Sequence, residues 1–409
     1  MIEVSTEQAR RFVLDIQGLR TEQPSKSILG VAKRIHNIQV DTISVVSRSH
    51  NLITFNRYKD YKEADIWKYQ RKGKLFEFWS HALCLLPIES FPYYAWAMKH
   101  APKFIWRTLL EWAAENKTLL EKVYSLVKKD GPLQSASIGE RTVKSDGWWD
   151  LKEEKWALEC LLFAGRLMVS YREGFQKYYD LTERVLPSGI DTEPMPEDEI
   201  PRFVVDTSIS SIGLASYKDI KLYMGKLASK IFWNSRQKLI ELYLEELIKD
   251  DVLIEVSVND SKLRYFTLKK YLPRLKKSAT DSIGEVPVKL LSPFDNIMRE
   301  RHYPQDMFGF DYKIECYVPA PKRQYGYYVL PILDKSSIAG RLDAKVHRAT
   351  GLLEIKSLFF ESDQLKTDDG LDRLRRGISD FAQFNNCDSI EVGDVYPKKM
   401  TKSVRTTII

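Results

Sequence analysis

The sequence predicts an α+β protein, and two observations favour this class. The order of one helix followed by two short strands occurs twice, in residues 158–187 and 242–273. Beyond residue 285 the pattern changes to short segments in which apolar and polar residues alternate, as they do in antiparallel strands. We therefore expect helix-and-hairpin modules followed by a C-terminal antiparallel β domain, small and barrel-like.

The two repeats share their internal order and their ends. Each runs from a helix into a strand, a polar turn, a second strand with paired aromatic residues, and then Leu-Pro. A helical stretch precedes each repeat, at 118–129 and at 208–224. Two helices followed by a β-hairpin form a winged-helix module, so we predict tandem winged helices. The alternative is that the order of helix and hairpin recurs by chance, as it does in other α+β proteins.

The first part of the chain is predicted to be mainly helical. Ser5 and Ser27 precede apolar stripes that are typical of amphipathic helices, which places two helices within residues 5–37. Residues 38–46 are rich in β-branched side chains and contain no Gly or Pro, so they are predicted to form a strand. Helical spacing resumes at 63–79 and again at 87–130.

Two segments are predicted linkers: residues 187–201, rich in Pro and acidic side chains, and residues 276–284. With these breaks, the predicted domains are 1–115, winged-helix-like with the 38–46 strand, 116–190 and 198–276, two further winged helices, and 285–409, the β domain. The strands expected in the β domain are 312–319, 325–333, 338–346, 352–360 and 389–392, and its expected helix is 369–384.

The composition is that of a globular protein with a substantial core. Of the 409 residues 44% are hydrophobic and 29% are charged, and the formal net charge of +7 leans mildly towards polyanions. No signal peptide or membrane span is recognisable, so we expect a cytoplasmic, monomeric protein. Four scattered cysteines and six scattered histidines form no ligand motif, which predicts no metal site and no cofactor.

Gln39 and Asp41 are the sharpest candidates for chemistry. Residues two apart on a strand point the same way, so the two side chains would lie side by side. A carboxylate beside an amide can hold and deprotonate one water molecule, which predicts a hydrolytic site. The alternative is that Asp41 turns the chain before Thr42, with Gln39 merely solvated.

Cationic and aromatic residues suggest where nucleic acid would bind. Arg48 and His50 follow the predicted strand. Lys322, Arg323, Gln324 and Tyr325 lie between two predicted strands, at what would be an exposed hairpin tip suited to phosphate and groove contacts. The alternative is an ordinary solvated turn.

Glu77 and His81 are a further candidate pair. Four residues apart on the predicted helix, they would share a helix face and could act as an acid–base or positioning pair. A histidine that is simply satisfied in the interior is the alternative.

Several blocks of the sequence match a known pattern. They are Gln39 to Ile43 with Arg48, FEFWSHALCLLP (76–87), GWW (147–149), FAGRLMV and YDLTERVLP (163–187), LSPFD (291–295), the long run 308–333, and GRLDAKVHRATG (340–351). On these blocks the chain resembles the YcaQ/AlkZ family of bacterial winged-helix DNA glycosylases, and specifically its YcaQ-type branch. The resemblance implies three winged-helix modules around a DNA channel, completed by a C-terminal β domain.

The resemblance also implies a reaction and its residues. The reaction is excision of N7-alkylated guanine from double-stranded DNA, including the unhooking of interstrand cross-links. The catalytic motif of the family, glutamine, an apolar residue, then glutamine or aspartate, falls on Gln39, Val40 and Asp41. The β-hairpin that the family places on DNA falls on Lys322 to Tyr325. The aspartate form of the motif favours a broad role in alkylation repair.

The chemistry expected of such an enzyme agrees with these residues. A carboxylate near C1′ would stabilise oxocarbenium character, and the neighbouring amide would hold the water. No Schiff-base lysine is evident, so we expect a monofunctional glycosylase without strand cleavage. Two other interpretations stay open: a winged-helix transcriptional regulator that binds DNA without catalysis, and a scaffold that recruits remodelling factors.

Overall fold

Serine caps define the first two helices, as the sequence predicts. The Ser5 hydroxyl accepts a hydrogen bond from the Gln8 N–H at the start of α1 (Thr6–Ile16), 3.1 Å away. The Ser27 hydroxyl accepts from the Gly30 N–H, 3.0 Å away, at the start of α2 (Ile28–Ile35). Such caps satisfy N–H groups that have no partner within the helix.

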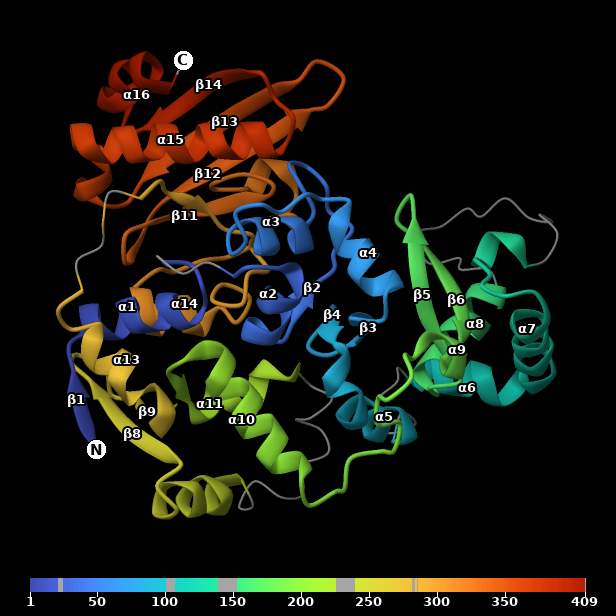
Figure 1. The fold of residues 1–409 in the computed structure, drawn as a ribbon. Helices are drawn as coiled ribbons and strands as arrows, with labels where there is room; N and C mark the ends of the chain where they lie inside the picture. The colour runs from blue at the N-terminus through green and yellow to red at the C-terminus, as the bar shows by residue number, and fades with distance from the viewer. Residues whose placement is uncertain are drawn as a thin grey trace. The chain divides into compact units, whose positions relative to one another are not determined.

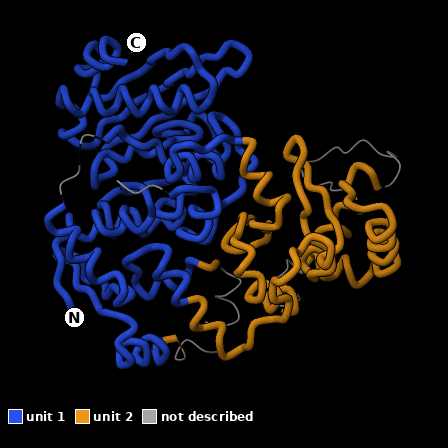
Figure 2. The backbone as a smooth tube through the Cα atoms, viewed as in Figure 1, with its two compact units in different colours: residues 1–63, 205–223, 241–409 blue, residues 64–204, 224–240 orange. Residues whose placement is uncertain are grey.

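The computed structural model describes residues 1–20, 25–100, 107–138, 153–225, 240–281, 284 and 286–408. The GWW block at 147–149 lies outside these residues. The chain divides into two compact units (Figure 2). The first unit comprises residues 1–63, 205–223 and 241–409, and the second comprises 64–204 and 224–240. The predicted four-domain division stays a prediction.

The first unit contains β1 (Ile2–Val4), α1, α2, β2 (Ile38–Gln39), α3 (Ser49–Phe55), most of α10 (Ile200–Ile212), β7 (Ala215–Ser216), α11 (Tyr217–Tyr223), β8 (Leu253–Val258), β9 (Arg264–Leu268), η4 (Lys269–Tyr271), α13 (Leu272–Lys277), β10 (Lys289–Leu290), α14 (His302–Phe308), η5 (Ala320–Lys322), β11 (Val329–Asp334), β12 (Ser337–His347), β13 (Leu352–Phe360), η6 (Asp363–Lys366), α15 (Asp368–Phe384), β14 (Ser389–Tyr396), η7 (Lys398–Met400) and α16 (Thr401–Ile408).

The second unit contains α4 (Asp65–Arg71), β3 (Leu75–Trp79), β4 (Leu83–Pro87), η1 (Ile88–Ser90), α5 (Phe91–Lys99), α6 (Arg107–Glu115), α7 (Lys117–Asp130), η3 (Ser135–Ser137), α8 (Glu153–Phe163), β5 (Leu167–Glu173), β6 (Gln176–Leu181) and α9 (Thr182–Val185).

The C-terminal sheet has five strands in the order β10-β11-β12-β13-β14. The first four pair antiparallel, and β14 runs parallel to β13, because α15 carries the chain back across the sheet (Figure 1). Helix α15 packs closely on the segment just before β10. A Cβ atom at Gly377 of this helix would lie only 2.4 Å from the Val288 carbonyl oxygen, so the close approach requires glycine there. The predicted α+β class is confirmed, and within the described residues this sheet is open rather than a closed barrel.

Both predicted helix-and-hairpin repeats are present. In the first unit, residues 241–249 are helical and lead into the antiparallel hairpin β8–β9, which joins β1 and β7 in a four-stranded sheet. In the second unit, α8 leads into the antiparallel hairpin β5–β6. The winged-helix assignment itself stays a prediction.

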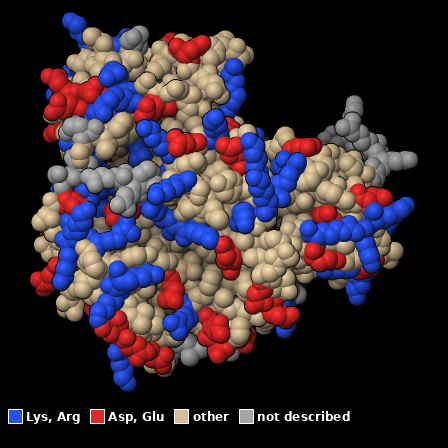
Figure 3. All heavy atoms as spheres, viewed as in Figure 1, with Lys and Arg blue, Asp and Glu red and all other residues tan. Residues whose placement is uncertain are grey.

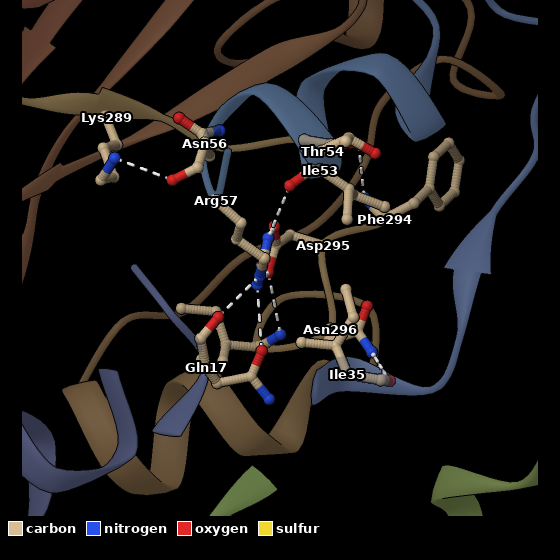
Figure 4. A network of polar contacts seen from close by, with 12 residues as sticks. Gln17, Ile35, Ile53, Thr54, Asn56, Arg57, Lys289, Phe294, Asp295 and Asn296 are labelled. Carbon is tan, nitrogen blue, oxygen red and sulfur yellow. Dashed lines mark hydrogen bonds and ion pairs between the residues drawn. The ribbon is translucent and has the colours of Figure 1, made fainter. Parts of the chain in front are cut away.

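A buried network stabilises the first unit (Figure 4). The guanidinium of Arg57 forms two hydrogen bonds, of 2.6 and 2.8 Å, with the Asp295 carboxylate, and neither side chain has any solvent exposure. Its other donors reach the carbonyl oxygen and amide oxygen of Gln17 and the carbonyl oxygen of Ile53. All five donors of the guanidinium are therefore used, as a buried charge requires. Next in the chain, Asn296 donates to the Ile35 carbonyl oxygen, 3.0 Å away.

Five predicted elements differ from the structure, and one of them, the strand predicted at 325–333, begins only at Val329. The predicted helix 63–79 is wrong beyond Arg71, because Gly73, at φ +62°, ends α4 and the chain enters β3. The predicted helix 208–224 is interrupted by Gly213, at φ +92°, and by β7. The predicted strand 312–319 is a loop, and the predicted strand 38–46 ends at Gln39.

Candidate active site

The segment that follows β2 turns at Asp41. The Asp41 carboxylate accepts a hydrogen bond from the Ile43 N–H, 2.8 Å away, so the chain leaves the extended conformation there. The strand prediction is wrong at this point, and the alternative, that Asp41 turns the chain, describes the local structure. Gln39 is 7% exposed rather than solvated, and Asp41 is half-buried.

The environment of Asp41 makes its carboxylate more basic than usual. Burial raises the pKa of Asp41, and the N–H groups of Ile43 and Thr42 offset part of that rise. A carboxylate that is desolvated and yet still partly accessible is suited to take a proton from water. The same group therefore combines a turn-forming hydrogen bond with the electrostatics of a general base.

The segment after Asp41 is anchored on the C-terminal sheet. The Val346 N–H donates to the Val45 carbonyl oxygen, 3.0 Å away. The Arg348 guanidinium donates to the carbonyl oxygens of Ser44 and Val46, at 3.2 and 2.6 Å. Both anchors lie at the end of β12 or just beyond it, so the β domain fixes the segment that carries the candidate carboxylate.

A second set of contacts joins this segment to the LSPFD block. The Ser292 hydroxyl donates to the Ser49 hydroxyl, 3.1 Å away, and lies 3.2 Å from the Tyr328 hydroxyl. Burial and the nearby Asp41 carboxylate raise the pKa of Tyr328 far above its usual value, although the hydrogen bond with Ser292 acts the other way. Tyr328 thus keeps its proton and serves as a neutral neighbour of Asp41.

The Asp41 carboxylate also acts electrostatically on two residues of the loop between α14 and β11. Burial and the Asp41 carboxylate raise the pKa of the Cys316 thiol. Partial desolvation, Cys316 and Asp41 together raise the pKa of Tyr317, which is 80% exposed. Neither residue stood out in the sequence, because both fell inside the predicted strand 312–319. The signal that could have revealed them is their place within the 308–333 block.

Lys322, Arg323, Gln324 and Tyr325 do not form a hairpin tip. No strand precedes them in the described part of this loop, and Lys322 ends the short helix η5. Lys322 and Gln324 are exposed, whereas Arg323 and Tyr325 are partly buried. The hairpin interpretation is therefore wrong in geometry, while the DNA-binding role of the four residues stays a prediction.

Arg48 and His50 lie at the start of α3. Arg48 is the residue before the helix and is half-buried. His50 is 1% exposed, which leaves its side chain almost no surface to offer DNA in this conformation. Their proposed contacts with DNA stay predictions.

Glu77 and His81 do not share a helix face. Glu77 lies on β3, and His81 lies in the turn before β4 with its Nδ1 atom 3.7 Å from the Cys84 sulfur. The Glu77 carboxylate is fully buried and accepts two hydrogen bonds of 2.7 Å from Arg172. The pairing predicted on a helix is therefore wrong, and Glu77 is engaged in an ion pair of the second unit.

A basic cluster that the sequence patterns did not single out lies on α13. Lys and Arg side chains gather over α1 and α13 on the face shown in Figure 3. Three of them, Arg274, Lys276 and Lys277, stand in the last turn of α13, and Arg274 forms an ion pair of 2.6 Å with Asp15. The run of cations after residue 268 is the signal that could have indicated this surface.

Neither a metal centre nor a membrane span is found in the described segments. No group of three or more of their His, Cys, Asp or Glu side chains is arranged to hold a metal ion. Among the helices in the same segments, none combines the length and the hydrophobicity that a bilayer crossing requires.

Two comparisons with known proteins bear on these residues. The family model described as "DNA glycosylase AlkZ-like" matches residues 32–381, which include the Asp41 segment and most of the β domain. The structure is similar to that of the Streptomyces sahachiroi DNA glycosylase AlkZ, with a TM-score of 0.65 and 16% sequence identity, over 96% of this chain and 100% of that chain. The likeness in structure supports the fold, and the family match spans most of the sequence. The chain therefore belongs to the AlkZ-like family of DNA glycosylases, hydrolases that act on N-glycosyl bonds of DNA.

Proposed function

We propose that the protein is a monofunctional DNA glycosylase that releases N7-alkylated guanine, including guanine held in interstrand cross-links. The observation that carries the proposal is the half-buried Asp41 carboxylate with its raised pKa, beside a loop that exposes an aromatic ring. In a chain of this family, such a carboxylate is the group best suited to act at the glycosidic bond.

The proposed chemistry begins with the charge of the substrate. Alkylation at N7 makes the base cationic, so the C1′–N9 bond breaks with both electrons passing to the base, which leaves neutral. Positive charge develops on the sugar, and the Asp41 carboxylate stabilises it. Water then bonds to C1′ and gives its proton to Asp41, while the Gln39 amide orients that water.

A monofunctional enzyme uses water and no lysine amine. Among the lysines that the structure describes, Lys289 most resembles a nucleophile, because burial lowers its pKa to about 8. Its ammonium donates to the Asn56 carbonyl oxygen, 2.8 Å away. Lys289 lines a cavity of about 630 Å³ whose lining does not include Asp41. This arrangement supports hydrolysis without a covalent intermediate.

DNA would be held mainly by exposed cations of the first unit. Lys322 is exposed on the same loop as Cys316 and Tyr317, and Lys276 and Lys277 are exposed on α13. Arg323 contributes less directly, since its Nε donates to the Val318 carbonyl oxygen at 2.8 Å. Contacts of this kind give affinity and salt dependence rather than sequence preference.

The test is release of 7-methylguanine from methylated duplex DNA under single-turnover conditions. The wild type is expected to release the base, and Asp41→Asn is expected to be slower by roughly 10²–10⁴-fold, the range of a general base. Asparagine keeps an oxygen that can accept from the Ile43 N–H, so the variant removes the charge and leaves the turn. Equal rates would remove Asp41 from the mechanism. Tight DNA binding without release from any N7-alkylated duplex would favour a regulator.

A second substrate tests the cross-link proposal. A duplex joined through the N7 atoms of two guanines separates into single strands in a denaturing gel only after unhooking. The wild type is expected to unhook it, with the same dependence on Asp41. Release of 7-methylguanine without unhooking would restrict the enzyme to monoadducts.

A further inference from the structure

The loop between α14 and β11 is closed by one carboxylate. Glu315, 7% exposed, accepts hydrogen bonds from the N–H groups of Gln324, Tyr325 and Gly326 at 2.9, 2.8 and 3.1 Å. Burial alone would raise the pKa of Glu315, but the three donors hold it below the usual value. The carboxylate thus stays charged and joins the two sides of the loop.

Two arginines fix the same loop from other directions. The Arg341 guanidinium donates to the Asp311 carbonyl oxygen, 2.6 Å away, and lies over the rings of Phe310 and Tyr325 at 4.2 and 4.3 Å. Arg323 donates to the Val318 carbonyl oxygen. Glu315 and Val318 are therefore both held, which restrains the residues between them, Cys316 and Tyr317.

Of the five tyrosines in this restrained loop and at its ends, two are buried, two are partly buried and only Tyr317 is exposed. Tyr312 and Tyr328, at the two ends of the loop, are 2% and 0% exposed, and their hydroxyls are hydrogen bonded. Tyr317 is 80% exposed. A ring that is 80% exposed buries little apolar surface within the protein, so most of it is available to contact a ligand.

The exposed ring and the candidate carboxylate are carried by two segments that are both tied to the C-terminal sheet. The Asp41 segment is tied to β12 through Val45 and Val346, and to Tyr328 through Ser49 and Ser292. Tyr328 follows the loop that carries Tyr317 and directly precedes β11, so the same end of β11 and β12 supports both groups. Asp41 also acts electrostatically on Tyr317 and on Cys316.

We propose that the ring of Tyr317 stacks on the alkylated base and recognises its positive charge, resting on the function proposed above. The face of a phenol ring attracts cations, and base stacking on an aromatic ring is favourable for every base. N7-alkylguanine offers both a flat ring and a positive charge. Tyr317 would thus prefer the cationic lesion to the neutral guanine, while Asp41 acts at the sugar.

The ring and the hydroxyl can be tested separately. Tyr317→Phe keeps the ring and is expected to retain kcat/KM for 7-methylguanine release within about twofold, whereas Tyr317→Leu is expected to lose roughly 5- to 100-fold. The loss should appear mainly as weaker binding of methylated duplex, with binding of undamaged duplex unchanged. Tyr396→Phe, on β14, is the control for a change at another tyrosine: it keeps the ring that stacks on Phe359 at 4.8 Å and is expected to match the wild type.

Three results would overturn the inference. They are full activity of Tyr317→Leu, an equal loss in Tyr317→Phe, and an equal loss of binding to undamaged duplex. Failure of the proposed function is distinguishable, because the wild type itself would then release no base. In that case the binding measurements still test the inference. If the wild type binds methylated duplex more tightly than undamaged duplex and Tyr317→Leu does not, recognition by the ring is supported. If the two proteins show the same preference, the inference is refuted.

Discussion

The side chain of Asp41 accepts a hydrogen bond from the backbone N–H of Ile43, 2.8 Å away. One carboxylate oxygen therefore forms the hydrogen bond of the turn, and the Asp41 residue as a whole is half-buried. The charge of Asp41 is thus held in place by the backbone and is poorly solvated. This combination favours reactivity over stability, since desolvation penalises the charged form.

The first prediction separates activity from stability at Asp41. Because its pKa in the folded protein is raised above the ordinary 3.8, the charged carboxylate lowers the free energy of unfolding at neutral pH. Asp41→Asn is expected to lose activity and yet to have a melting temperature equal to the wild type or higher. Thermal unfolding at pH 7 measures this. A variant that melts well below the wild type would show that its inactivity reflects misfolding.

The second prediction concerns the pH dependence of the wild type. The carboxylate form of Asp41 is the active one, so the single-turnover rate should fall as pH is lowered through its raised pKa. The inflection should lie above 3.8, the usual pKa of an aspartate. Rates of 7-methylguanine release between pH 5 and 8, corrected for spontaneous depurination, measure where the rate begins to fall.

The same pH series tests Gln39. A Gln39→Ala variant whose rate begins to fall at the same pH but is lower at high pH would fit a role for the amide in holding water.

The third prediction concerns phosphate binding by Lys322. Replacing this exposed lysine with alanine should weaken binding to every duplex alike and reduce the slope of log K against log salt by about 0.9 for each phosphate that the side chain neutralises. Fluorescence anisotropy at several salt concentrations gives the slope. Lys402→Ala, at an exposed lysine on α16, is the control and should leave the slope unchanged. An unchanged slope for Lys322→Ala would exclude phosphate binding by this lysine.

The fourth prediction concerns the buried pair Arg57–Asp295. Arg57→Met leaves the Asp295 carboxylate buried without its partner, which should lower the free energy of unfolding by about 3–5 kcal/mol. Replacing both residues with apolar ones should cost less than the sum of the single changes. Urea unfolding measures all three variants. A decrease below about 1 kcal/mol for Arg57→Met would mean that water or another group replaces the guanidinium.

The fifth prediction concerns Lys289, whose pKa in the folded protein is lowered to about 8 from 10.5. Between these values the unfolded chain binds a proton that the folded chain has released, so this lysine adds stability as pH rises from about 8. The wild type should therefore gain free energy of unfolding over Lys289→Met between pH 8 and 10, with a constant difference below pH 8. The same pH dependence of the free energy of unfolding in the two proteins would contradict the lowered pKa. Lys345→Met, at an exposed lysine, serves as the control.

Local signals were sufficient to predict much of the fold. Ser5 and Ser27 mark helix starts through hydrogen bonds that span three residues, and the strand β13 and helix α15 follow their periodicity almost residue for residue. The helix predicted over 63–79 failed because apolar spacing alone does not separate a helix from the strand β3. Gly73 was the available signal for the break.

The site was harder to predict because its members come from distant segments. The sequence did identify Asp41 as a candidate. Its conformation was not predicted, because the Asp41 carboxylate accepts a hydrogen bond from the Ile43 N–H and so turns the chain where a strand was expected. Tyr317 and Cys316 feel the charge of Asp41 from a loop that lies far along the sequence, which no local pattern reveals. The partners of Glu77 and Arg57 lie 95 and 238 residues away, beyond the reach of any periodicity.

The division of the chain into units has a consequence for synthesis on the ribosome. The first unit takes residues 1–63 from the start of the chain and 241–409 from its end. Arg57 is therefore made 238 residues before Asp295, a delay of about 12–48 s at roughly 5–20 residues per second. During that interval the guanidinium of Arg57 lacks its carboxylate partner, and the apolar residues that pack against the C-terminal sheet lack theirs. Chaperone occupancy of the emerging chain should thus persist until the LSPFD block leaves the exit tunnel, a pattern that ribosome profiling of chaperone-bound chains would reveal.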